Sequence, residues 1–326
     1  MIYTNEYLKQ LQSLPLEAKI NITTQRIRDW YNHYDGQVYV SFSGGKDSTV
    51  LLYLARSVHP DIEAVFVNTG LEYPEIQKFV KSFDNVTILI PKIRFDEVIK
   101  KYGYPIISKE VSKCVNQGKK ALVTGKYFYC LQKLNGTAVD KQGRKNRFNK
   151  EKYKPLLDVD FNVSFMCCNV MKKAPLKQFF KETHKYPITA QMTEESALRK
   201  QQWLKNGCNG FKMKSPISNP MSFWTEQDVL NFIKKFNIKI ASVYGEIEHK
   251  KDNEQMRFDD FNVDNYLSTD LHTTKCHRTG CMFCLFGAHL DKKDGIGRFE
   301  LLKTTHPRCY EYCMGGRRIR KRNMAT

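Results

Sequence analysis

A glycine-rich segment at residues 41–48 has the residue types and the order that bind phosphate groups. It reads Ser-Phe-Ser-Gly-Gly-Lys-Asp-Ser and directly follows the apolar run Val38–Val40. Its two glycines allow positive φ angles and let backbone N–H groups approach an anion, while the lysine adds charge and the serines add hydroxyl donors. A helix that starts here aims its N-terminal amides at the same point. The candidate phosphate-binding residues are Ser41, Ser43, Gly44, Gly45, Lys46, Asp47 and Ser48.

The spacing of this segment separates it from the Walker-A loop, which reads Gly-x4-Gly-Lys-Ser/Thr and serves γ-phosphate chemistry. The segment instead resembles the pyrophosphate loop (PP-loop) of the adenine-nucleotide α-hydrolase superfamily, whose members cleave ATP between the α- and β-phosphates. The resemblance implies a bound ATP, with Lys46 neutralising the departing pyrophosphate and Asp47 helping to position Mg²⁺.

A second element, at residues 68–75, reads Asn-Thr-Gly-Leu-Glu-Tyr-Pro-Glu. It resembles the Thr-Gly…Pro-Glu element that reductases of the phosphoadenosine-phosphosulfate type and their relatives carry after the second strand. The nucleotide-site residues that this resemblance implies are Asn68, Thr69, Gly70 and Glu72. Gly70 would allow a close backbone approach beside the adenosine. The alternative is an ordinary strand-exit turn, because Thr-Gly and Pro are common turn residues.

A third element, at residues 191–199, reads Gln-Met-Thr-Glu-Glu-Ser-Ala-Leu-Arg. It resembles the family segment with an acidic-Ser…Arg helix start that contacts phosphate or substrate. Ser196 and Arg199 lie one helical turn apart and share a face. Arg199 is suited to a bidentate phosphate contact and is a candidate catalytic residue with Lys46 and Asp47. Alternatively, the two glutamates of this element favour a helix N-terminus through its dipole.

The cysteines form a further pattern. Cys167 and Cys168 are adjacent, and Cys281 and Cys284 form a C-x2-C pair about 110 residues later. This arrangement resembles the four-thiolate iron–sulfur site of assimilatory adenylyl-sulfate reductases, and thiolates are the ligands that such clusters take. The resemblance implies a 4Fe–4S cluster. Its candidate ligands are Cys167, Cys168, Cys281, Cys284 and Cys313.

The fourth cluster ligand stays open between Cys167 and either Cys313 or Cys276. Zinc is the main alternative metal, because four thiolates, or three with His277 or His289, also suit it. Packed thiols without a metal are the other alternative, since cysteine is often a small buried apolar residue.

Short apolar strands alternate with amphipathic helices along the first hundred residues. This β-α-β-α-β-α order predicts an α/β fold with a doubly wound parallel sheet and right-handed crossovers, in agreement with the adenine nucleotide alpha hydrolase-like fold that the resemblance implies. Ligands in such sheets lie at the carboxyl ends of the strands, where the glycine-rich segment is. We expect strands at 37–42, 62–67, 86–90 and 186–191, and helices at 16–34, 47–57, 73–83, 95–102, 169–184, 194–206 and from Thr225 onward.

Positive charge is concentrated in one part of the chain. The net charge is +19, and residues 109–154 alone hold thirteen Lys or Arg against three acids. Aromatic residues are interleaved with this charge, which suggests a surface for a nucleic acid (tRNA or DNA) whose bases stack on the rings. The alternative is a solvated basic face. The aromatic residues in question are Tyr127, Phe128, Tyr129, Phe148 and Tyr153, and a basic tail follows at 317–322.

We expect four segments along the chain. Residues 1–108 begin a nucleotide-binding α/β domain, 109–160 form a basic insertion, 161–245 complete the domain, and 246–326 form a cysteine-rich cluster lobe with the basic tail. The N-terminus lacks the pattern of a secretory signal, and no apolar run approaches the ~20 residues of a membrane span. We therefore expect a cytoplasmic protein that does not bind membranes, in which the ten cysteines are reduced.

The resemblance covers about residues 35–240, and the cysteine pattern extends it to residue 313. It implies an enzyme of the phosphoadenosine phosphosulfate reductase family that cleaves ATP and adenylylates a nucleic acid for sulfur modification, with a sulfur-donor protein as a further partner. The loop keeps the ATP-type sequence, and the C-terminus lacks the Glu-Cys-Gly-x-His motif of sulfonucleotide reductases. One alternative is a reductase that makes sulfite from adenylyl sulfate or its 3′-phosphorylated form. The other is a nucleotide-sensing, nucleic-acid-binding module without turnover.

Overall fold

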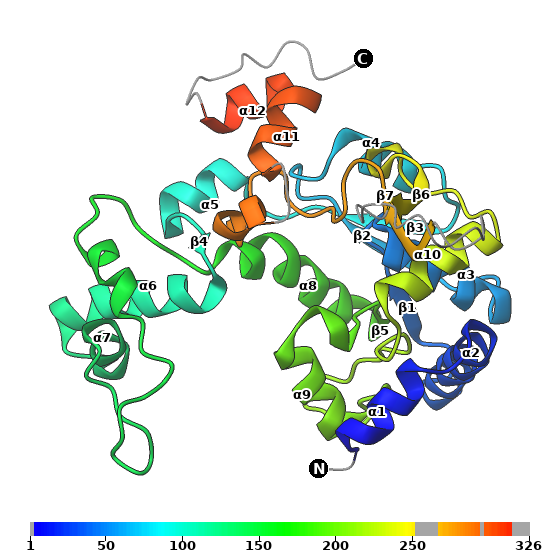
Figure 1. Cartoon of the computed structure of the whole chain (residues 1–326), viewed down its shortest axis with the longest axis horizontal. Helices are drawn as coiled ribbons and strands as arrows, with labels where there is room; N and C mark the ends of the chain where they lie inside the picture. Colours follow the sequence, from blue (N-terminus) through cyan, green and yellow to red (C-terminus); the bar gives the residue numbers. More distant parts are fainter. Residues whose placement is uncertain (1–2, 252–266, 294–296, 315–326) are drawn as a thin grey trace, which may run out of the picture. The chain divides into compact units, whose positions relative to one another are not determined.

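The computed structural model describes residues 3–251, 267–293 and 297–314 (Figure 1). The predicted basic tail at 317–322 lies outside these ranges. The chain divides into two compact units. The first comprises Met1–Asn68, Glu72–Ile90 and Pro175–Thr279, and the second comprises Thr69–Leu71, Pro91–Ala174 and Gly280–Thr326. In the described ranges, no helix combines the length and the apolar character that are needed to cross a bilayer.

The first unit is built on a four-stranded parallel sheet with the strand order β3-β2-β1-β5. The strands are Val38–Ser41 (β1), Ala64–Val67 (β2), Val86–Leu89 (β3) and Tyr186–Ile188 (β5). The predicted parallel sheet is confirmed, although all four strands are shorter than expected. The chain runs outward from β1 through β2 to β3, and β5 joins the other side of β1. The strand order thus reverses at β1, and ligands of such sheets bind at the carboxyl end beside that point.

Helices cover both faces of this sheet, as the doubly wound prediction requires. Helices α3 (Lys46–Val58) and α4 (Pro74–Val80) connect β1 to β2 and β2 to β3. Helix α8 (Ala174–Thr183) covers one face, where its Phe179 and Leu176 pack against Tyr39 and Val65 of neighbouring strands. Figure 1 shows α3 and α8 on opposite sides of the strands. Tyr39 and Val40 alternate in direction along β1, so both faces bury apolar side chains.

The remaining elements of the first unit support this sheet. Helix α10 (Glu226–Lys235) begins with the expected capping box, in which Thr225 and Asp228 bond each other's backbone N–H groups. The segment expected to be irregular after residue 245 opens with an antiparallel strand pair, β6 (Ile247–Lys251) and β7 (Leu267–Thr273). That prediction was incomplete because a mostly polar two-stranded ribbon has no apolar alternation to reveal it. The other helices are α1 (Asn5–Gln12), α2 (Leu16–His33) and α9 (Ala197–Asn206).

The second unit is mainly helical and contains two separate apolar clusters. One lies between α6 and α7 and includes Val111, Val115 and Leu134. The other joins Val98 of α5 to Cys167 and Met171. A short parallel pair, β4 with β8, connects distant parts of the chain within this unit. The elements are α5 (Phe95–Tyr102), β4 (Ile106–Ile107), α6 (Lys109–Thr124), α7 (Phe128–Asn135), a π-helical turn (Asn169–Lys173), β8 (Leu285–Phe286), α11 (Arg298–Thr305) and α12 (Pro307–Met314).

Candidate functional site

The loop between β1 and α3 forms a tight turn lined by serine hydroxyls. Gly44 has a φ of +71°, and a Cβ atom there would lie 2.8 Å from Cγ2 of both Ile76 and Val80. Only glycine therefore fits at this position. The Ser43 and Ser48 hydroxyls lie 3.0 Å apart, and the Ser43 backbone N–H donates to Ser48 Oγ at 3.2 Å. The predicted strand–loop–helix arrangement is present at the switch point of the sheet.

The N-terminus of α3 directs its first amides into this turn. The Gly45 N–H donates to Ser43 Oγ at 3.3 Å, and the Lys46 N–H donates to the Tyr244 hydroxyl at 3.1 Å. That hydroxyl also shares a hydrogen bond of 2.7 Å with Thr279 Oγ1. Burial raises the pKa of the Tyr244 phenol, so the hydroxyl stays neutral at pH 7. The hydroxyls of Ser43 and Tyr244 thus accept hydrogen bonds from the Gly45 and Lys46 amides. Amides at a helix N-terminus are the groups that bind anions.

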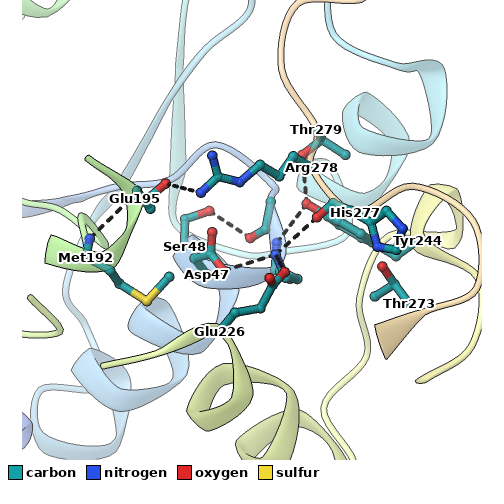
Figure 2. A network of polar contacts seen from close by, with 12 residues as sticks. Asp47, Ser48, Met192, Glu195, Glu226, Tyr244, Thr273, His277, Arg278 and Thr279 are labelled. Atoms are coloured by element: carbon teal, nitrogen blue, oxygen red, sulfur yellow. Dashed lines mark hydrogen bonds and ion pairs between the residues drawn. The ribbon is translucent and has the colours of Figure 1, made fainter. Parts of the chain in front are cut away.

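The Lys46 ammonium is buried at the centre of a polar network. Its side chain is 3% exposed, and Nζ lies 3.0 Å from Glu226 Oε1, 3.5 Å from Asp47 Oδ1 and 3.2 Å from the His277 carbonyl oxygen. Figure 2 shows these three groups converging on one nitrogen. Burial acts to lower the pKa of Lys46, but Asp47 and Glu226 outweigh it and raise the pKa. The lysine is therefore a fixed positive charge, and two carboxylates face the same site.

Two arginines flank this network and share one carboxylate. Arg278 Nη2 donates to Glu195 Oε1 at 3.1 Å, as Figure 2 shows, and Arg199 forms an ion pair with the same Glu195. Burial lowers the pKa of Arg199, and Arg278 acts in the same direction while Asp47 opposes it. Arg199 therefore lies within electrostatic reach of the glycine-rich loop. The structure brings together Lys46, Asp47 and Arg199, which the sequence placed in one site.

Ser196 has a local structural role in the described residues. It is the N-cap of α9, where its Oγ accepts a hydrogen bond of 3.3 Å from the Arg199 backbone N–H. The helix begins at Ala197, because a 3₁₀ turn at Thr193–Glu195 precedes it, and the expected start at residue 194 was early. This turn leaves Glu195 outside α9, so that its carboxylate can reach both arginines. A direct contact of Ser196 with a nucleotide stays a prediction.

Sequence reasoning missed five residues of this network. Glu226 was recognised only as part of a helix start, and no local motif marked the other four. These other four residues lie after α10, towards the end of the first unit. Only the fold brings them to the loop. The missed residues are Glu226, Tyr244, His277, Arg278 and Thr279.

The second predicted element, at residues 68–72, has the backbone that its sequence suggests. Gly70 has a φ of +74°, and a Cβ there would meet no described atom within 4 Å. The Asn68 N–H donates to a carbonyl of β3 at 2.8 Å, and Thr69 Oγ1 accepts from the Leu71 N–H at 3.3 Å. The Glu72 side chain is buried. Because Asn68 and Glu72 belong to the first unit and 69–71 to the second, a shared site with the loop stays a prediction.

Four predicted cluster cysteines lie close together within the second unit. Cys167 is 7% exposed, and burial, followed by the negative charges of Cys168, Cys281 and Cys284, raises the pKa of its thiol to about 12. Burial likewise raises the pKa of Cys284, with Cys168 acting in the same direction. Such mutual effects require short separations, because Coulomb interactions weaken with distance. The fold therefore gathers two cysteine pairs from distant parts of the chain.

Positive charge and apolar cover accompany these thiols. Arg298 and Lys172 act to lower the pKa of Cys284, so both cations lie near the cysteine pairs. The C-x2-C segment forms a turn in which the Cys284 N–H donates to the Cys281 carbonyl at 3.0 Å. Phe283, between these cysteines, is 8% exposed and lies against the rings of Phe95 and Tyr312, at centroid distances of 6.4 and 5.6 Å. The thiols therefore occupy a partly enclosed apolar setting.

The other candidate ligands differ from these four. Cys276 belongs to the first unit, and its Sγ donates to the Arg278 carbonyl at 2.9 Å. Cys313 lies on α12, where burial raises the pKa of its thiol. Among the described residues, no group of three or more His, Cys, Asp or Glu side chains has the arrangement of a metal site. The cluster, its fourth ligand and the choice between iron and zinc stay predictions.

The sequence matches the phosphoadenosine phosphosulfate reductase domain family at residues 37–137 and 130–285. These overlapping matches together cover well over half of the chain. The chain belongs to this family. The match includes the glycine-rich loop, Arg199 and the cysteine pairs, which confirms the predicted family.

Curated relatives match over shorter stretches. An uncharacterized protein of Methanocaldococcus jannaschii is 39% identical over 72 residues, which are 21% of this chain and 18% of the relative. An adenosine 5′-phosphosulfate reductase of Bacillus cereus is 30% identical over 90 residues, or 26% of this chain and 38% of the relative. The matched stretches thus span less than two fifths of these relatives. A solved phosphoadenylyl-sulfate reductase from Candida auris is 12% identical with a TM-score of 0.39, covering 74% of this chain and 91% of that one.

Proposed function

We propose that this protein cleaves ATP between the α- and β-phosphates and transfers the adenylyl group to an oxygen of a nucleic acid, which is thereby activated for sulfur modification. The observation that carries the proposal is the buried Lys46 ammonium, held between Asp47 and Glu226 beside the N-terminus of α3. Asp47 and Glu226 would repel a bound polyphosphate unless a further cation lay between these carboxylates and the phosphates. Mg²⁺ bound through one or two carboxylates and substrate phosphates meets that need.

The loop residues have distinct roles in this reaction. The hydroxyls and amides of Ser43, Gly44, Gly45 and Ser48 hold the departing pyrophosphate, and Lys46 neutralises it. Arg199, with Arg278 beside it, stabilises the charge that develops on the α-phosphate as the acceptor oxygen attacks and the pyrophosphate leaves. A sulfur nucleophile then displaces AMP. Asn68, Thr69, Gly70 and Glu72 contact the adenosine.

The two cysteine pairs supply four thiols of the type that holds a cluster, although in the described residues they do not have the arrangement of a metal site. Burial and, after it, the neighbouring thiols Cys168, Cys281 and Cys284 disfavour the deprotonated form of Cys167, and a metal cluster would offset this cost by binding the thiolates. We propose that Cys167, Cys168, Cys281 and Cys284 hold a 4Fe–4S cluster, with zinc as the alternative metal and Cys313 outside the ligand set. The cluster would supply redox or sulfur chemistry when bound.

Reduction of adenylyl sulfate to sulfite is the second candidate, favoured by the similarity to adenosine 5′-phosphosulfate reductases. Its catalytic thiol would have to be Cys313 or Cys309, both on α12. Burial raises the pKa of Cys313, which keeps it protonated at neutral pH and makes it a poor nucleophile. The third candidate, a nucleotide-sensing module, requires the loop to bind without turnover.

Two product assays separate these candidates. The protein, prepared without oxygen, is incubated with ATP, Mg²⁺ and either total tRNA or single-stranded DNA, and pyrophosphate is measured. A parallel reaction contains adenylyl sulfate and a thiol reductant, and sulfite is measured. Pyrophosphate that depends on the nucleic acid supports the proposal, and sulfite alone supports the reductase. Neither product, together with measurable ATP binding, favours the sensing module.

A further inference from the structure

The basic insertion forms an independent helical hairpin with a surplus of exposed aromatic side chains. Helices α6 and α7 pack through their own cluster, in which Gly118 closely approaches Leu134 and Leu157. Figure 1 shows these helices with a long loop extending from α7. No acidic residue occurs between Glu110 and Asp140, while this stretch contains five lysines. The surface of the hairpin therefore attracts anions along its whole length.

This hairpin exposes two aromatic rings, and one asparagine contacts both of the residues that carry them. Tyr129 is 48% exposed and Phe148 is 51% exposed, although the module has an apolar core that could bury them. The Asn146 side-chain amide donates to the Tyr129 hydroxyl at 2.8 Å, and its carbonyl oxygen accepts from the Phe148 N–H at 2.8 Å. Asn146 thus ties the Tyr129 side chain and the Phe148 backbone to one residue at the surface.

Each ring carries a cation. The Lys133 ammonium lies 5.1 Å from the centroid of Tyr129, and the Arg147 guanidinium lies 4.7 Å from the centroid of Phe148. In such contacts the cation lies over one face of the ring. A ring and an adjacent cation are the two groups that proteins use to bind a base and its phosphate in single-stranded nucleic acids.

The loop that carries Phe148 is itself well ordered by hydrogen bonds. Val139 and Lys145 form an antiparallel bridge, and the Asn149 side chain donates to the carbonyl oxygens of Gly136 and Ala138 at 2.9 and 3.2 Å. Phe148 is therefore presented by a closed loop that is fixed to the end of α7, the helix that carries Tyr129. A loop of this kind binds with less loss of conformational entropy, because its backbone is already ordered.

We infer that Tyr129 and Phe148, with Lys133 and Arg147, form a stacking platform for unpaired bases of the nucleic acid. This inference rests on the nucleic-acid acceptor of the proposed function and defines it further: the hairpin binds a single-stranded segment or loop. A base-paired duplex keeps its bases stacked on one another and offers only phosphates to the lysines. Unpaired bases add stacking energy on the rings, so that the platform discriminates strandedness.

Phosphate attraction and base stacking predict different behaviour of variants. Phe148→Ala removes a ring and leaves the charge unchanged, so we expect about 5- to 100-fold weaker binding of single strands with the same dependence on salt. Arg147→Ala removes a phosphate contact and should lower the salt slope by about 1. Phe148→Trp keeps an aromatic face and should retain affinity. Phe161→Ala, an exposed aromatic of the same unit, is the matched control and should have no effect.

The experiment measures binding of the full-length protein, without ATP, to a fluorescein-labelled 20-nucleotide single strand and to the duplex of the same length, by anisotropy at several salt concentrations. Tighter binding of the single strand, and loss of that preference in Phe148→Ala, support the platform. Equal binding of both forms, or an unchanged preference in the folded Phe148→Ala variant, overturns it. Binding to anionic lipid vesicles without single-strand binding also overturns it, in favour of a membrane surface.

Failure of this inference is distinct from failure of the proposed function. If single strands bind through the platform but no pyrophosphate forms, the adenylylation chemistry is wrong while the platform stands. If pyrophosphate release depends on a nucleic acid that binds equally well to Phe148→Ala, the chemistry stands and the platform is wrong.

Discussion

The glycine-rich loop of the first unit and the cysteine group of the second unit are the two proposed ligand sites, and their protein environments differ. In the loop, Ser43, Ser48 and Tyr244 satisfy the backbone amides, and carboxylates neutralise Lys46. In the cysteine group, burial first and neighbouring thiols second raise the pKa of Cys167 and of Cys284. Under the proposed function, the phosphate site is ordered by the protein alone, whereas the thiolate site would be completed by its metal.

The largest effect is expected from removing the loop's buried charge. Lys46→Met should lower pyrophosphate release by about 10²- to 10³-fold, because it removes the cation that neutralises the leaving group. Lys19→Met is the matched control, since Lys19 is equally buried and is paired with Asp228 at 2.6 Å. Both variants lose a buried ion pair, but only the first should lose activity. An equal loss of pyrophosphate release in both would mean that Lys46 acts only through stability.

The cysteine group is tested by its metal content. Protein purified without oxygen should be brown and contain about four irons per chain, and Cys284→Ser should lose most of this iron. ATP binding to the loop should persist in that variant, because the loop lies in the other unit. Cys208→Ala, which changes a buried thiol of the first unit, should keep the iron. Colourless wild-type protein with one zinc per chain would contradict the cluster assignment.

The pH dependence of stability should distinguish the two regions in metal-free protein. The pKa of Cys167 is raised from 9.0 to about 12, so the folded state holds this proton more tightly than the unfolded state does. Its contribution to stability is therefore complete below pH 9 and is lost as the pH rises from 9 towards 12. Thermal unfolding followed from pH 8 to pH 10.5 should show a falling Tm, with a shallower fall in Cys167→Ala.

Cys114 must be included as a control in that measurement. Burial raises the pKa of its thiol to about 12 as well, with Cys130 acting in the same direction. Cys114→Ala should reduce the slope independently, because this thiol lies in the separate cluster between α6 and α7. If the Tm falls as steeply with pH in Cys167→Ala as in the wild-type protein, the pKa of Cys167 is not raised in the folded state.

The smallest effect is expected at the hydroxyl that caps α3. Tyr244→Phe removes the acceptor of the Lys46 N–H, which should cost about 1 kcal/mol of unfolding free energy. The phosphates of a bound nucleotide can take over that amide, so the Kd for ATP should change less than about threefold. Urea unfolding and calorimetric titration measure the two quantities. An affinity loss above tenfold would mean that the hydroxyl itself contacts the ligand.

Sequence reasoning succeeded where the signal was local. Residues 38–48 encode a strand, a glycine turn and a helix start within eleven positions, and the helix at Phe95–Tyr102 has the predicted bounds. The capping box at Thr225 was likewise readable, because its two partners are three residues apart. The family followed from the same local motifs.

The parts that escaped prediction depend on tertiary contacts. Glu226, Tyr244 and Arg278 reach the loop only through the fold, and no spacing rule links them to residue 46. Strands β6 and β7 are mostly polar, so no alternation of apolar and polar residues marks them. A long segment separates them in the sequence, so no short turn marks the pair either. The start of α9 was misplaced because the two glutamates that suggested a helix N-terminus belong to the 3₁₀ turn that precedes the helix.

The central claim is that the glycine-rich loop holds the two phosphates that leave from ATP. Incubation of the protein with ATP labelled at the γ-phosphate, Mg²⁺ and nucleic acid, followed by chromatography, tests this directly. The label should appear in pyrophosphate, with AMP or an adenylylated acceptor as the other product. Label in orthophosphate together with ADP would contradict the account, because the bond between the β- and γ-phosphates would then be the one that breaks.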